Sequence, residues 1–190
     1  MRGALTILSW LLILAYPLIV FFGLHVVPVA YLGVFLVILA AARLCLAPPM
    51  ARGWVLSMVI PSIVILAGLH AFLTESERGL LFYPAIVNAV LLCVFGASML
   101  RKQTFVERLA RLRDPDLSPA AVAYTRAVTG AWCLFFAANA AAALYTAMYT
   151  SLEVWALYNG LLAYLLMGAM FAGEWLVRRK VMRSGGVQAG

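Results

Sequence analysis

Charged side chains are scarce in this sequence. Of its 190 residues, 7 are Asp or Glu and 14 are Lys or Arg, so 11% are charged while 66% are hydrophobic. Soluble domains typically have about a quarter of their residues charged, so the composition excludes a soluble globular fold. The mean hydropathy of +1.02 predicts a chain composed mostly of membrane-spanning helices.

Cysteine and histidine are also rare. The chain has three Cys and two His, with no CxxC spacing and no Cys close to a His, so neither a zinc site nor a redox pair is predicted. We expect Cys45, Cys93 and Cys133 to be buried as small apolar side chains. The apolar runs contain no Ser-Lys, His-Asp, Glu-x-x-His or paired-Asp arrangement, and we therefore predict no enzymatic activity, cofactor or metal.

Six apolar runs are long enough to span a bilayer, whose hydrocarbon core of about 30 Å requires about 20 helical residues. The expected spans cover approximately residues 5–24, 29–47, 54–73, 80–99, 124–148 and 153–177. They predict an all-α polytopic membrane protein: one integral domain over residues 1–190, a bundle of six transmembrane helices with a short amphipathic cytoplasmic helix.

The basic residues predict the orientation of this bundle. Thirteen of the 14 Lys and Arg residues fall in one set of alternate gaps between the spans, whereas the other set holds only Arg78, with Glu75, Glu77 and Glu153. Cytoplasmic loops retain positive charge, so both termini are expected to be cytoplasmic. The net charge of +7 then indicates contact with anionic lipid headgroups, which attract each basic residue by about 1 kcal/mol, and not with nucleic acid.

The loop between the fourth and fifth spans contains the amphipathic segment 104–113. The sequence places Phe105, Val106, Leu109 and Leu112 on one helical stripe. Glu107, Arg108 and Arg111 are expected to face away from that stripe. We expect the segment to lie on the inner leaflet; the alternative is packing on the bundle or on a partner protein. The candidate contact residues are Phe105, Arg108, Leu109, Arg111, Leu112 and Arg113.

A turn follows this segment. Asp114 and Asp116 flank a proline and have no third ligand nearby, so we interpret them as turn residues and not as a metal or catalytic pair. Ser118 followed by Pro119 is typical of a helix N-cap followed by proline at the first helical position. We expect the fifth span to begin there.

Four polar residues within the spans are candidate intramembrane contacts. Asn88 and Asn139 lie near the middle of the fourth and fifth spans, at similar depth, so their amides could hydrogen-bond between helices and fix their register. The alternative is that they line a polar cavity. Arg126 and Glu174 lie near the cytoplasmic ends of the last two spans and are expected to form an ion pair.

Prolines and small residues shape the expected packing. Pro17, Pro61 and Pro84 each interrupt a span and predict kinks, and we favour a packing role over the broken helices of transporters. Small side chains permit close approach between helices, so we expect the last two spans to form a tight hairpin. The small residues are Ala137, Ala138, Ala140, Ala141, Ala142, Ala143, Gly160, Gly168, Ala172 and Gly173.

Several short motifs suggest a family. The order of YPLIVFF at 16–22, FVERL at 105–109, AWCLFFAAN at 131–139 and Trp155, with a basic end to the last span, resembles the intracellular septation protein A family of bacterial inner membranes. The resemblance implies a role in envelope maintenance and division through contacts with other membrane proteins. It carries no catalytic residues.

Two further motifs, FYPAIVN at 82–88 and QTF at 103–105, resemble a group of small bacterial inner-membrane proteins often encoded beside aryl-polyene or fatty-acid-synthase-like genes. We therefore predict a non-enzymatic inner-membrane protein that organises the envelope through protein or lipid contacts. The alternative is a carrier or export accessory for a lipid or aryl-polyene precursor, with Asn88, Asn139 and the proline kinks along its path. The sequence does not predict an oligomeric state.

Overall fold

The computed structural model describes residues 15–46 and 55–185, and the described residues are helical with no strand. The all-α class is therefore confirmed for this part of the chain. Residues 5–14 of the first expected span and residues 47–54, where the second expected span ends and the third begins, lie outside it. In chain order the elements are α2 (Tyr16–Val26), α3 (Val29–Leu46), α5 (Val55–Thr74), α6 (Arg78–Leu81), α7 (Tyr83–Met99), α8 (Phe105–Arg111), α9 (Pro119–Tyr149), α10 (Leu152–Leu157), the π-helix η1 (Tyr158–Leu162) and α11 (Ala163–Gly185).

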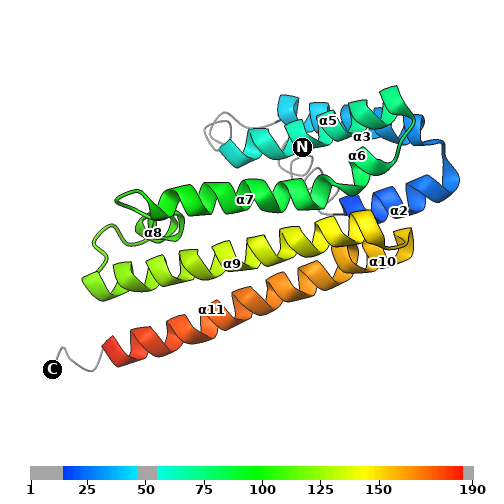
Figure 1. The fold of residues 1–190 in the computed structure, drawn as a ribbon. Helices are drawn as coiled ribbons and strands as arrows, with labels where there is room; N and C mark the ends of the chain where they lie inside the picture. The colour runs from blue at the N-terminus through cyan, green and yellow to red at the C-terminus, as the bar shows by residue number, and fades with distance from the viewer. Residues whose placement is uncertain (1–14, 47–54, 186–190) are drawn as a thin grey trace.

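The long helices lie side by side, with α3 packed on α5, α7 packed on α9, and α11 at the outer edge beyond α9 (Figure 1). Two glycines let α3 and α5 approach closely. A Cβ atom at Gly33 would lie 2.5 Å from the carbonyl oxygen of Gly68, and one at Gly68 would lie 2.7 Å from that of Gly33. The two backbones are thus in direct contact, as small residues allow in membrane helices.

Proline 84 determines where the fourth apolar run changes from α6 to α7. It lies in the first turn of α7 and has no N–H to donate to the carbonyl of Leu80. The Tyr16 hydroxyl donates to that carbonyl instead, at 3.1 Å, and the buried indole Nε1 of Trp155 donates to the carbonyl of Leu81 at 3.0 Å. Side chains from α2 and α10 thus donate hydrogen bonds to the two carbonyl groups at the break between α6 and α7.

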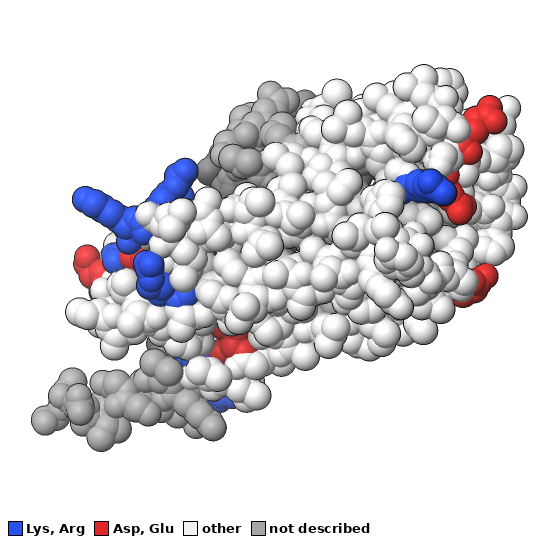
Figure 2. Space-filling model, viewed as in Figure 1, with Lys and Arg blue, Asp and Glu red and all other residues white. Residues whose placement is uncertain are grey.

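Two described helical segments, Pro119–Tyr149 and Leu152–Arg179, are long and apolar enough to cross a membrane, with 31 and 28 residues. The other apolar helices count as shorter in this test, with 10–17 residues each within the residues that it covers. Most of the surface between the two ends of the bundle is free of charge on the face in Figure 2, and Lys and Arg gather around α8 at one end. The shorter helices are Tyr16–Val26, Val29–Cys45, Val59–Thr74 and Tyr83–Met99.

The expected burial of the cysteines is wrong. Cys45 and Cys93 are exposed and Cys133 is half-buried. The physical reason is that apolar side chains also cover the outside of this bundle, where Leu134 is 75% exposed and Phe171 is 57% exposed. In such a chain an apolar residue type does not indicate an inward position.

Candidate functional site

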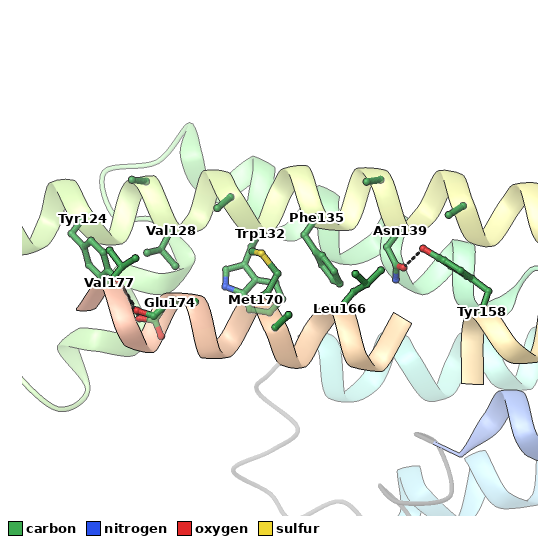
Figure 3. A pocket seen from close by; sticks show the side chains of 16 residues that line it. Tyr124, Val128, Trp132, Phe135, Asn139, Tyr158, Leu166, Met170, Glu174 and Val177 are labelled. Atoms are coloured by element: carbon green, nitrogen blue, oxygen red, sulfur yellow. Dashed lines mark hydrogen bonds between the residues drawn. The ribbon is translucent and has the colours of Figure 1, made fainter. Parts of the chain in front are cut away.

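A groove of about 910 Å³ runs between α9 and the last helical run, open to the surface of the bundle. Its walls are almost wholly apolar, and Figure 3 shows the side chains that line it. We call it the α9–α11 groove. The bulky lining residues labelled there are Tyr124, Val128, Trp132, Phe135, Tyr158, Leu166, Met170 and Val177, and the small ones are Ala127, Ala131, Ala138, Ala142, Ala169 and Gly173.

Large aromatic side chains hold the two walls apart. Trp132 from α9 contacts Phe171 of α11, with ring centroids 4.7 Å apart, and the Tyr124 hydroxyl donates to the Glu174 carbonyl at 3.0 Å. Between these bridges the lining includes the small residues Ala127, Ala131 and Gly173. A Cβ atom at Gly173 would meet no atom within 4 Å.

The expected tight hairpin of the last two spans is therefore wrong. Only part of the small-residue set packs closely: Ala143 is fully buried, and a Cβ atom at Gly160 would lie 3.1 Å from Leu18 of α2. Ala138, Ala142 and Gly173 instead line the groove. The physical reason is that the Trp132 and Tyr124 contacts fix the separation of α9 and α11, so that small residues in the lining leave space.

Asn88 and Asn139 meet at the end of the groove farthest from α8. The Asn139 amide nitrogen donates to Asn88 Oδ1 at 3.0 Å, and the Tyr158 hydroxyl donates to Asn139 Oδ1 at 2.8 Å. Asn88 in turn donates to the carbonyl of Pro84 at 2.8 Å. The predicted hydrogen bond between the amides is present, and the addition of Tyr158 links α7, α9 and η1.

The π-helix η1 explains how two consecutive residues both reach α9. A π-turn adds a residue to the helical turn and redirects the side chains beside it. Tyr158 bonds to Asn139, while Asn159 Nδ2 donates to Thr146 Oγ1 at 3.2 Å. Sequence reasoning missed both partners, because a regular α-helix would point neighbouring residues in directions about 100° apart.

The amide pair predicts a measurable coupling energy. Replacing Asn88 and Asn139 with Leu, singly and together, should give a double-mutant cycle with a coupling of about 1 kcal/mol in the free energy of unfolding, because the bond lies in an apolar interior. Unfolding in detergent micelles measures it. A coupling near zero would show that the two amides act independently.

The expected ion pair between Arg126 and Glu174 is absent. Arg126 is exposed, and its Nη2 donates to the carbonyl of Met99 at 2.8 Å, where α7 ends. Cations are favourable at helix C-termini. Glu174 faces Tyr124 from the other wall of the groove, with the phenol oxygen 3.5 Å from Oε1 (Figure 3). Tyr124 therefore links α9 and α11 in place of Arg126.

The start of the amphipathic segment packs on the bundle, which is the alternative to docking on the inner leaflet. Phe105 lies against Phe95 at 4.3 Å between ring centroids, so the start of α8 packs on the bundle. Glu107, expected to face outward, is 3% exposed and pairs with Arg111 at 2.9 Å. Leu112, expected on the packing stripe, is 75% exposed. The short helix begins at the Thr104 cap, whose hydroxyl accepts from the Glu107 N–H and keeps Glu107 against the bundle.

The remaining candidate contacts divide between the two faces of α8. Leu109 is 41% exposed, Arg108 and Arg113 are exposed, and Arg111 is half-buried. A second nitrogen of Arg111, Nη1, donates to the Pro115 carbonyl at 2.6 Å. This hydrogen bond fixes the turn that follows α8. The predicted N-cap at Ser118 is confirmed, since its hydroxyl accepts from the Ala121 N–H at 3.3 Å.

Comparison of the chain with protein-family models, curated proteins and solved structures finds no match. The resemblance to septation proteins stays a prediction. Among the side chains described, no group of three or more His, Cys, Asp or Glu could hold a metal ion. The chemistry that the groove offers is therefore apolar contact along its length, with a carboxylate at one end and a satisfied amide network at the other.

Proposed function

We propose that this is a six-span, non-enzymatic protein of the bacterial inner membrane that holds one long apolar chain of a lipid in the α9–α11 groove. The described helices support the spans: α3, α5 and α7 have 18, 20 and 17 residues, or about 27, 30 and 26 Å. These lengths are close to the hydrocarbon thickness of a bilayer, about 30 Å.

The positions of the loops support cytoplasmic termini. Helix α8 and the C-terminal end of α11 lie at the same end of the bundle (Figure 1), and Lys and Arg gather at that end (Figure 2). Positive charge marks the cytoplasmic side. The exposed Leu109 and Leu112 beside Arg108 and Arg113 suit a membrane surface with anionic headgroups.

The volume of the α9–α11 groove is the observation that carries the proposed function. Ligand pockets are usually about 300 to 1,000 Å³, and the groove, at about 910 Å³, lies within that range. The groove therefore has room for a narrow flexible chain such as the acyl chain of a lipid.

The length of the groove also fits a lipid chain. Its lining follows α9 from Tyr124 to Ala142, 18 residues or about 27 Å. One leaflet contributes half of the hydrocarbon core, about 15 Å, so a chain can lie extended in the groove from the cytoplasmic interface past the middle of the bilayer. Holding such a chain would serve lipid transfer or organisation in the envelope without chemical change.

Photocrosslinking tests this proposal at two neighbouring positions of α11. A photoreactive amino acid at Leu166, which lines the groove, should form a lipid adduct in protein purified extensively in detergent, whereas the same group at Leu165, which is 60% exposed and outside the groove, should not. Mass spectrometry identifies the adduct. Equal adduct yields at both positions, or none at either, would contradict a retained chain in the groove.

A further inference from the structure

Glu174 is the acidic side chain in the lining of the α9–α11 groove. It is half-buried and faces Tyr124 at the end nearest α8 (Figure 3). The Tyr124 hydroxyl donates mainly to the Glu174 carbonyl, at 3.0 Å, and lies 3.5 Å from the carboxylate. Among the described side chains, the ion pair is formed by Glu107 and Arg111 and does not include Glu174. The carboxylate of Glu174 thus borders an apolar groove without a basic partner from the described residues.

The residues that follow Glu174 place it at the level of lipid headgroups. Trp175 is 53% exposed, and the guanidinium of Arg179 lies 4.5 Å from the centre of its ring. Tryptophan and long basic side chains are typical of the membrane interface. In the proposed six-span arrangement, the Glu174 end of the groove therefore meets headgroups, while the groove extends inward from there.

At the other end of the groove each polar side chain of the lining already has a hydrogen-bond partner. Asn139 donates to Asn88 and accepts from Tyr158, so the proton of the Tyr158 hydroxyl is already used. A ligand that places its apolar tail there breaks no hydrogen bond. The groove is thus polarised: the tail fits at Asn139 and the headgroup at Glu174.

The negative charge of Glu174 determines which lipid headgroup binds best at this end of the groove. A carboxylate attracts a cation, and its strongest hydrogen bonds are with charged N–H donors. A primary ammonium provides such donors, whereas a quaternary ammonium has no N–H. Arg178, one helical turn after Glu174, is exposed and can face the phosphate of the same headgroup.

We infer that the α9–α11 groove binds a phospholipid whose headgroup carries a primary ammonium, with one acyl chain in the groove and the ammonium at Glu174. This inference rests on the proposed function, since it requires a chain in the groove. A purely anionic lipid would place like charges together at Glu174 and is disfavoured.

The test is competition between phosphatidylethanolamine and phosphatidylcholine with identical acyl chains, supplied to the purified full chain in mixed micelles. Retained lipid is counted by native mass spectrometry. The wild type should retain the ethanolamine lipid over the choline lipid by about tenfold, the factor that 1.4 kcal/mol represents. Glu174→Gln should reduce this ratio to about one. The control Glu153→Gln removes a carboxylate outside the groove and should keep the wild-type ratio.

The outcomes separate the inference from the proposed function. A wild type that retains lipid in the groove with no preference for ethanolamine would overturn the headgroup assignment and leave chain binding intact. A preference that persists in Glu174→Gln would also overturn it. A wild type that retains neither lipid would overturn the proposed function and the inference together.

Discussion

Tryptophan in place of Ala138 should lower the amount of lipid that co-purifies with the protein by at least about tenfold, equivalent to 1.4 kcal/mol. Ala138 lines the α9–α11 groove between Phe135 and Asn139, where its small side chain leaves space. An indole there would occupy the path proposed for the lipid chain. The ratio of phospholipid to protein after extensive detergent exchange is the measurement.

A matched control lies one helical turn away on α9. Leu134 is 75% exposed and is outside the groove, so Leu134→Trp adds the same ring to the same helix and should leave bound lipid unchanged. Ala131→Trp, at another position of the lining, should reproduce the loss if Ala138→Trp folds poorly. Normal lipid retention in both folded groove variants would contradict the binding site.

Leucine at Gly68 should destabilise the protein by about 3 kcal/mol or more, the upper part of the range for overpacked sites. A Cβ atom there would lie 2.7 Å from the Gly33 carbonyl oxygen and 2.9 Å from Cγ2 of Val37. Backbone cannot move aside as a flexible side chain can, so α3 and α5 must separate. The free energy of unfolding in micelles measures the effect.

The same substitution at Gly96 provides the control. A Cβ atom at Gly96 of α7 meets nothing within 4 Å, so Gly96→Leu should change stability by less than about 1 kcal/mol. If both variants were equally stable, the close contact between α3 and α5 would be incorrect. The pair separates the effect of overpacking from the general effect of replacing glycine in an apolar helix.

The features that could be predicted from the sequence depend on local physics. Apolar runs ended by polar residues located the helices, and Ser118 followed by Pro119 located the start of α9 because the cap and the proline act within one turn. Asn88 and Asn139 could be paired because few polar groups share that depth, and a buried amide needs a partner.

The α9–α11 groove could not be predicted because it depends on the relative sizes of side chains from separate helices. Small residues permit close packing but do not enforce it, and Trp132 and Tyr124 hold the walls apart. Glu107 was misplaced for a related reason. Its position is set by the Thr104 cap and the Arg111 pair more than by the apolar stripe.

The most direct test of lipid binding in the α9–α11 groove is the native mass spectrum of the wild-type chain, purified through detergent exchange that removes loosely associated lipid. The groove, of about 910 Å³, is proposed to hold one extended chain, so we expect a predominant species with one bound phospholipid per protein. A spectrum of lipid-free protein, or a broad series of lipid numbers that declines evenly on washing, would contradict a specific lipid-binding groove between α9 and α11.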